Sequence, residues 1–328
     1  MNRPPRPRED PPPKPPACAP RASTKAAATG TSVAAPPSSS AAPAASESPA
    51  PCVPHIAPAA EPERPSPLHL QILSSGSEGN STLIRCGELT VLVDAGLTMR
   101  ALTERLEAAR IAQNQVDHVV LTHAHLDHAR SAGIVGKRHG AIVHCPEAMM
   151  QNRSVARAPR LSTLPVGGVF ELEVPGSDEA LKIETVPLPH DCDPTVAMRL
   201  SHAGRTAIIL TDCGHPRHDL KDALQGANVL VLEFNHDPVL METSPYPPKL
   251  RKRILGDQGH LSNAQAQALL RELVGPDLHT LFLAHLSGKT NTPDLALSAA
   301  KETLEELGRL DVDVQVALQH EVGPNLEV

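Results

Sequence analysis

The chain has 328 residues and a formal net charge of −7, with one tyrosine, three phenylalanines and no tryptophan. No apolar segment approaches the length of about 20 residues that a helix needs to cross a bilayer, so we expect no membrane association. The six cysteines form no C-x-x-C pair, which argues against a disulfide framework and favours a reducing compartment. We therefore expect a cytoplasmic protein.

The first 67 residues differ in composition from the rest of the chain. They hold 19 of the 34 prolines, many Ala and Ser and no aromatic residue. Such a segment cannot bury enough apolar surface to offset the entropy lost on ordering. No apolar stretch typical of a secretory signal follows the arginines near its start. We predict a disordered, dispensable and solvated tail over 1–67, whose protein partner is unknown from the sequence, and one α/β domain over 68–328.

Deletion of residues 1–66 is expected to leave the melting temperature and the activity nearly unchanged, because a segment of this composition has nothing to pack. Calorimetry and activity measurements on the full and shortened chains check this expectation. A large loss of stability would show that the segment packs against the domain.

Strand-like and helical patterns alternate along residues 68–328. Strands are predicted at 68–73, 81–86, 89–93, 116–121, 141–144, 181–187, 195–201, 205–211, 279–284 and 312–318. Helical spacing predicts a helix over 99–110, and another is expected to begin after the strand at 116–121. Ser262 and Gln265 form a capping box before a helix near 264–274, and Thr292-Pro293 opens a helix that runs to about Leu307. Ala203-Gly204 is expected to form a hairpin turn.

The strand at 116–121 leads into the string His-Ala-His-Leu-Asp-His at 123–128. Side chains two residues apart in extended chain lie on one side, so His123 and His125 can bind one ion together. The chain must then turn, and Asp127 and His128 point to a second place nearby. The alternative is a solvated polar loop in a chain with 17 histidines. The motif therefore needs further ligands downstream.

Three such residues follow apolar runs later in the chain. His190 comes shortly after the run at 181–188, Asp212 directly follows the run at 206–211, and His285 directly follows the run at 280–284. Strand ends in layered α/β folds point several loops at one place. Imidazole and carboxylate ligands without thiolates suit zinc, manganese or iron, and an aspartate between two ions can bridge them. The sequence predicts one dinuclear site formed by His123, His125, Asp127, His128, His190, Asp212 and His285.

Cys192 and Cys213 each lie within two residues of a predicted ligand. Cys213 directly follows Asp212, and neighbouring side chains in extended chain point to opposite faces, so this thiol faces away from the ion. We expect neither cysteine to bind metal.

The chain resembles the metallo-β-lactamase-fold hydrolases and, among them, the YycJ/WalJ-like group of proposed DNA exonucleases. The strings that carry the resemblance are SSGSEGN at 74–80, VDAG at 93–96, HAHLDH at 123–128, TDCG at 211–214, LEFNHD at 232–237, GHLSN at 259–263 and AHLS at 284–287. The histidine-rich string is typical of the superfamily, while the N-H-D, G-H-L-S-N and H-L-S strings are typical of the subgroup. Cys213, where the group usually has threonine, and the long tail are departures.

This resemblance implies an αββα four-layer sandwich and a dinuclear phosphodiesterase that uses two divalent ions, Zn²⁺ or Mn²⁺ with iron as a further option. His123, His125 and His190 are expected to hold one ion, Asp127, His128 and His285 the other, and Asp212 to bridge them. A hydroxide between the ions would attack phosphorus, with Asp127 also part of the catalytic group.

Further residues are expected to support this reaction. Asp94 is predicted to orient a ligand imidazole, with a turn-forming aspartate as the alternative. His260 and His236 are candidate proton donors to the leaving oxygen, or else structural histidines. His260 lies just before a helix N-terminus, which also favours phosphate. The loop residues Ser75, Ser77 and Asn80, together with Asn235, are expected to support the site or contact substrate, and the alternative for the loop is a plain turn.

Charge argues mildly against a nucleic-acid substrate. Residues 68–328 carry 23 Lys and Arg against 32 Asp and Glu, a net −9, unlike the basic field of a bulk nucleic-acid binder. Local cations would have to hold DNA, and the candidates are 249–253 and the group Arg153, Arg157 and Arg160. Both could instead be solvated surface.

Two other functions remain open from the sequence. The same metals can hydrolyse a carbonyl compound, so a glyoxalase-II-like thioesterase, or another ester or amide hydrolase, is the alternative enzyme. A metal-bound interaction or sensor protein is the non-enzymatic alternative. The strings at 235–237 and 259–263 favour phosphodiesters, and DNA is the expected substrate.

Overall fold

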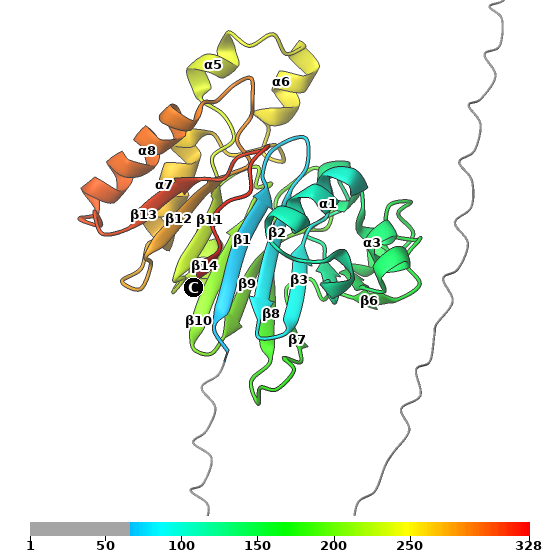
Figure 1. The fold of residues 1–328 in the computed structure, drawn as a ribbon. Helices are drawn as coiled ribbons and strands as arrows, with labels where there is room; N and C mark the ends of the chain where they lie inside the picture. Colours follow the sequence, from blue (N-terminus) through cyan, green and yellow to red (C-terminus); the bar gives the residue numbers. More distant parts are fainter. Residues whose placement is uncertain (1–65) are drawn as a thin grey trace, which may run out of the picture. The chain divides into compact units, whose positions relative to one another are not determined.

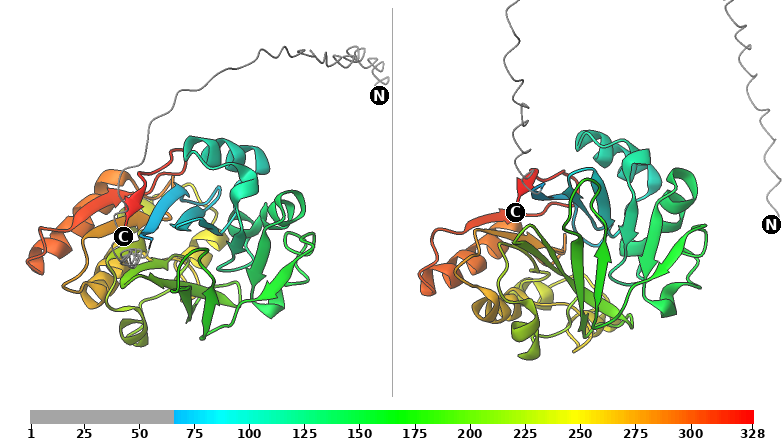
Figure 2. Two further views of the ribbon diagram at one scale, coloured as in Figure 1. Left: turned by 60° about the horizontal axis from the view of Figure 1, so that its bottom comes forward. Right: turned by 90° about the horizontal axis from the view of Figure 1, so that it is seen from below.

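A computed structural model describes residues 66–328, so the tail predicted over 1–67 lies almost wholly outside the described residues. Two seven-stranded sheets face each other (Figures 1 and 2). The first contains β14 (Leu326–Glu327), β1 (Leu68–Ser74), β2 (Ser81–Cys86), β3 (Leu89–Val93), β4 (His118–Val120), β5 (Ile142–Cys145) and β6 (Leu161–Thr163). The second contains β13 (Asp313–Val316), β12 (Thr280–Ala284), β11 (Val229–Glu233), β10 (Arg205–Leu210), β9 (Thr195–His202), β8 (Leu181–Leu188) and β7 (Val169–Leu172).

Helices cover the outer face of each sheet. Helices α1 (Met99–Ala108), α2 (Leu126–Ala129) and α3 (Ala132–His139) pack on the first sheet, and α4 (Asp219–Leu224), α7 (Asn263–Leu273) and α8 (Pro293–Glu306) pack on the second. Helices α5 (Pro238–Glu242) and α6 (Pro248–Ile254) stand beyond the strand ends in Figure 1. Short 3₁₀ turns occupy Gln113–Gln115 and Glu147–Met149. Among the described residues, no helix combines the length and apolar character needed to span a membrane.

Three apolar clusters separate the four layers. One lies between the sheets and the others lie between each sheet and its helices. Strands β10 and β11 have continuously apolar sequences because both of their faces are buried. Ile209 and Val231 pack between the sheets, while Ile208 and Leu230 pack against the helices. The predicted αββα sandwich is therefore confirmed.

Both sheets follow the same plan. Strands β1 to β3 pair antiparallel and β3 to β6 parallel, and β7 to β10 pair antiparallel and β10 to β13 parallel. The parallel strands end at one edge, which gathers the loops that follow them.

The predicted local signals agree with the structure. The Ser262 hydroxyl accepts from Gln265 N at 3.2 Å, and the Gln265 side chain accepts from Ser262 N at 2.9 Å, so the capping box forms and α7 begins there. Thr292 caps α8. Ala203 and Gly204, both at positive φ, join β9 to β10.

Several elements differ from the sequence-based expectation. Strand β4 is shorter than 116–121, and the helix after it is divided into α2 and α3. Strands β6, β7, β11 and β14 and helices α4 to α6 were not expected. Except for the apolar β11, these elements are short, and α5 and α6 begin at proline, so they lack the periodicity on which prediction depends.

The buried histidine of β5 is expected to make stability depend on pH. His144 is 3% exposed, and its Nε2 lies 2.8 Å from Nδ1 of His118. Burial, aided by the nearby His118, lowers the pKa of His144 from 6.5 to about 4. The unfolded chain therefore binds this proton first as pH falls, and stability is lost between about pH 6.5 and 4.

Urea unfolding of metal-free protein at several pH values measures this effect against His144→Leu. The substitution removes the titrating group, so the free energy of unfolding should fall less steeply below pH 6.5 in the variant than in the wild type. Equal slopes in the two proteins would contradict the assignment.

Candidate metal centre

The predicted ligands meet at the edge where the parallel strands end. Three residues there adopt positive φ although they are not glycine: Asp94 after β3, Asp212 after β10 and His285 after β12, at 63°, 61° and 55°. This conformation is uncommon outside glycine and is concentrated at functional sites. Each strand thus ends in a sharp turn that directs a side chain into the same cluster.

A glycine allows the histidine-rich loop to approach β3. A Cβ atom on Gly96 would lie 1.6 Å from the carbonyl oxygen of Asp127, so no other residue fits. Asn80 N and Ala95 N donate to Asp127 O and His128 O, both at 2.7 Å. The strings at 74–80 and 93–96 therefore hold the loop that carries Asp127 and His128.

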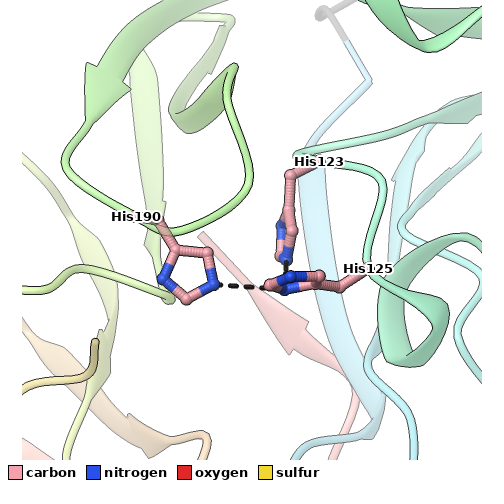
Figure 3. Close-up of side chains that lie close together, drawn as sticks. All are labelled: His123, His125 and His190. Carbon is pink, nitrogen blue, oxygen red and sulfur yellow. Dashed lines mark hydrogen bonds between the residues drawn. The ribbon is translucent and has the colours of Figure 1, made fainter. Parts of the chain in front are cut away.

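Three histidines form the first group of candidate ligands (Figure 3). His123 Nε2 and His190 Nε2 lie 3.1 and 3.2 Å from His125 Nδ1. Nitrogen ligands of a tetrahedral zinc ion at 2.0–2.1 Å stand about 3.3 Å apart. The three nitrogens therefore have the spacing that one such ion requires.

These imidazoles are held neutral and oriented. Burial lowers the pKa of His123, His125 and His190, which preserves the lone pair that a metal needs. His190 Nδ1 donates to Gly259 O at 3.0 Å, so its Nε2 faces the cluster. A Cβ on Gly259 would lie 2.0 Å from the carbonyl oxygen of Ile254, which explains the glycine there.

The second group consists of Asp127, His128 and His285. The Oδ2 atom of Asp127 lies 3.6 Å from Nε2 of both histidines. His128 donates from Nδ1 to Asp94 Oδ2 at 2.7 Å, and Asp94 also accepts from Thr122 N at 2.9 Å. Asp94 thus contacts a candidate ligand, and its positive φ shows that it also forms the turn.

Asp212 lies between the two groups and is 1% exposed. Its Oδ2 is 3.2 Å from His128 Nε2, and its Oδ1 is 3.6 Å from Nε2 of both His190 and His285. Asp212 Oδ2 and His285 Nε2 are buried without a hydrogen-bond partner. One carboxylate therefore reaches ligands of both groups, and the unpartnered atoms are suited to bind cations.

The buried carboxylates of the cluster favour positive charge on the imidazoles beside them. Burial opposes it, yet the carboxylates of Asp212 and Asp94 raise the pKa of His128 well above its usual value. Likewise Asp212, Asp127 and Glu233 outweigh burial and raise the pKa of His285 to about 10. Protons on these imidazoles balance the carboxylates in the protein alone, and divalent cations can take their place. The residues present therefore fit a metal centre.

Glu233, at the end of β11, was missed as a site residue in the sequence. It is fully buried and accepts from His260 Nδ1 at 2.8 Å and from Cys213 N at 2.9 Å, and its Oε1 lies 3.3 Å from His285 Nδ1. Burial would raise its pKa, but His260 and His285 hold that pKa at about 2. The sequence signal that could have identified Glu233 is its position as a charged residue at the end of the apolar run 229–233.

Glu233→Gln is expected to lower metal affinity or activity by about 10- to 100-fold, because carboxylates that orient metal-bound imidazoles have effects of this size. Metal titration and phosphodiesterase rates measure the loss, and Glu305→Gln on the exposed side of α8 is the control. Unchanged affinity and rate in the Glu233 variant would leave this carboxylate a purely structural role.

The other predicted supporting residues also lie at the cluster. Asn80 Nδ2 is 2.9 Å from His128 Nε2, Ser75 Oγ accepts from His285 N at 2.8 Å, and Asn235 Nδ2 donates to His285 O at 2.8 Å. Ser77 is exposed and lines a cavity of about 310 Å³ that opens over Asp127, Asp212 and His285.

The two candidate proton donors differ in position. The side chain of His260 is 17% exposed and lines this cavity, with Nδ1 held by Glu233. Ligand atoms of Asp212, Glu233, His260 and His285 also lie within 4.8 Å of one another. His236 is 1% exposed and does not line the cavity, and burial lowers its pKa to about 4. The structure thus favours the structural alternative for His236.

The two groups of candidate cations differ in their distance from the metal cluster, since only one of them lines its cavity. Helix α6 brings Arg253 to the cavity, where it pairs with Asp191. Arg153, Arg157 and Arg160 belong to the segment between β5 and β6 and line none of the described cavities. Within residues 66–328, no candidate ligand group includes a cysteine.

This chain is similar in sequence to proteins of a known family. A family profile described as "Beta-lactamase superfamily domain" matches residues 90–285. A Bacillus anthracis protein named exodeoxyribonuclease YycJ is 29% identical over 244 residues, which cover 74% of this chain and 90% of that protein. A Streptococcus pneumoniae protein named exodeoxyribonuclease WalJ is 29% identical over 226 residues, which cover 69% of this chain and 84% of that protein.

A solved structure supports the fold. The metallo-β-lactamase fold protein YhfI from Bacillus subtilis superimposes with a TM-score of 0.59 at 16% sequence identity, over 79% of this chain and all of that one. Similarity at this identity supports the architecture and carries no information on substrate.

Proposed function

This chain belongs to the β-lactamase superfamily, as its motifs predict, and we propose that it is a dinuclear metal-dependent phosphodiesterase that degrades DNA from an end. The observation that carries the proposal is Asp212, a buried carboxylate within 3.2–3.6 Å of imidazoles from both ligand groups. The names of the relatives, which are exodeoxyribonucleases, support DNA as the substrate.

His123, His125 and His190 would hold one ion, Asp127, His128 and His285 the other, and Asp212 both. Ions bound there would supply a nucleophile at neutral pH and positive charge opposite the phosphate oxygens. Zinc and manganese both suit imidazole and carboxylate ligands. The protein's own residues perform the remaining tasks.

Orientation of the ligands is the first task. Asp94 fixes His128, Gly259 O fixes His190, and Glu233 with Asn235 fixes His285. Because these contacts exist before substrate binds, the ligand atoms need little rearrangement.

Proton transfer to the leaving oxygen is the second task, and we assign it to His260. Glu233 accepts from its Nδ1 and so leaves its Nε2 to face the cavity. A positioned imidazole of this kind can protonate an alkoxide as the P–O bond breaks.

A panel of substrates tests the proposed function. Metal-loaded protein is incubated with end-labelled single- and double-stranded DNA, bis-p-nitrophenyl phosphate and a thioester. We expect stepwise release of nucleotides and cleavage of the small diester. Rapid thioester hydrolysis without cleavage of either diester would contradict the proposal and favour the glyoxalase-II-like alternative.

A further inference from the structure

The cavity of about 310 Å³ that opens over Asp127, Asp212 and His285, called the metal cavity below, adjoins two other cavities. One segment of the chain contributes to the lining of all three. The first neighbour, about 1080 Å³, shares Leu250 and Arg253 with the metal cavity. The second, about 480 Å³, shares Ser77, Tyr246 and Ser287 with it. We call these the basic cavity and the tyrosine cavity. Residues 246–253, which include most of α6, contribute to the lining of each cavity, with Tyr246 alone lining the tyrosine cavity. Helix α6 stands beyond the strand ends in Figure 1.

The side chains of this segment line the cavities in different combinations, and Leu250 and Arg253 line both the metal cavity and the basic cavity. Leu250, Arg253 and Ile254 of α6, at helical spacing, line the metal cavity together with Tyr246, which precedes the helix. Lys249 and Lys252 line the basic cavity and are exposed. Neither lysine forms an ion pair with another described residue, whereas Arg253 is paired with Asp191. Two cations thus remain available beside the metal centre.

These lysines stand out because the rest of the domain is acidic. Residues 68–328 carry a net −9, yet four of the five positions at 249–253 are Lys or Arg. Two acidic residues, Asp191 and Asp257, also line the basic cavity, and the first is neutralised by Arg253. The positive charge along α6 can therefore attract a polyanion to the metal centre.

Tyr246 places an aromatic ring where the metal cavity meets the tyrosine cavity, because it lines both. It is the only tyrosine of the chain, while Phe234 and Phe282 are fully buried and Phe170 packs against the core. Prolines precede and follow it, which limits its backbone freedom. Its hydroxyl lies 3.2 Å from Ser287 Oγ, and Lys289 Nζ lies 5.6 Å from its ring centroid.

We propose that residues 246–253 bind a polynucleotide strand across the metal centre, with a base stacked on Tyr246 and backbone phosphates held by Lys249 and Lys252. The combination of an aromatic face with a basic track is how proteins bind single strands without reading their sequence. The inference rests on the proposed nuclease function and adds the surface that selects a polymer over a small diester.

The lysines are tested with Lys249→Gln/Lys252→Gln in the metal-loaded full chain. Each phosphate contact on a single strand contributes about 0.7 to the slope of log affinity against log salt. We expect log(kcat/KM) for an oligonucleotide to depend on log[NaCl] with a slope shallower by about 1.4 in this variant. The ratio of kcat/KM on the oligonucleotide to that on bis-p-nitrophenyl phosphate should fall at low salt.

A matched double variant controls for charge. Lys221→Gln/Lys301→Gln removes the same two charges from exposed positions on α4 and α8, and its slope should equal that of the wild type. Equal changes in both double variants would overturn the proposal, because the effect would then reflect net charge alone.

The stacking role of Tyr246 is tested with a substrate that lacks a base. Tyr246→Leu should lower kcat/KM on an ordinary oligonucleotide by about 5- to 100-fold, the range for loss of one base–aromatic stack. On an oligonucleotide with an abasic terminal position the loss should largely disappear, and Tyr246→Phe should retain activity. An equal loss on both substrates would overturn the stacking role.

The outcomes separate this inference from the function on which it rests. If the wild type cleaves oligonucleotides but the lysine variant keeps its salt slope, the binding surface is wrong and the nuclease function stands. If the wild type cleaves bis-p-nitrophenyl phosphate and no polynucleotide, the nuclease function fails and the inference fails with it.

Discussion

Asp212→Ala is expected to lower the phosphodiesterase rate by about 10³-fold or more, since metal ions contribute several kcal/mol of charge stabilisation in the transition state. The reason lies in the position of this carboxylate, whose two oxygens reach His128 on one side and His190 and His285 on the other. Its removal should weaken both ion sites together. Rates on bis-p-nitrophenyl phosphate and metal content after desalting measure the two effects.

Asp222→Asn provides the control, because Asp222 is exposed on α4. This variant should keep the rate and the metal content of the wild type. An Asp212→Ala protein that retained both ions and most of its activity would show that this carboxylate does not join the two ligand groups.

His260→Ala is expected to retain both ions and lose about 10²- to 10⁴-fold in rate on DNA, the usual span for general acid–base catalysis. A donated proton matters most when the leaving oxygen is strongly basic. The loss should therefore shrink on bis-p-nitrophenyl phosphate, whose leaving group needs little protonation. Steady-state kinetics on the two substrates measure the difference.

Three other results for His260 would each reassign it. A similar loss on both substrates would indicate a phosphate contact, and full activity on DNA would make it structural. Loss of an ion would make it a ligand, which its place within 4.8 Å of Asp212, Glu233 and His285 permits. His218→Ala, at an exposed position that lines none of the described cavities, controls for removal of a histidine.

The sequence was most informative where chemistry requires a short motif. The string at 123–128 and the residues that end apolar runs, His190, Asp212 and His285, were predicted as one cluster, and the structure brings them together. The capping box at Ser262 was predicted because a cap is a local interaction.

Long-range contacts were beyond the reach of the sequence. Glu233 lies in a continuously buried strand, and its contacts with His260 and Cys213 depend on how distant loops fold back. His236 and His260 were both candidate proton donors in the sequence, and it is their burial and their position relative to the cavity that distinguish them. Likewise, the two groups of cations had equal standing until α6 was placed beside the cavity.

The central claim is that two ions bound by one cluster make the centre active, and a single titration tests it. Metal-free protein receives Zn²⁺ or Mn²⁺ in measured equivalents while hydrolysis of bis-p-nitrophenyl phosphate is followed. We predict that activity rises to a plateau at two equivalents per chain. A plateau at one equivalent, with no second ion bound at higher concentration, would contradict the dinuclear centre.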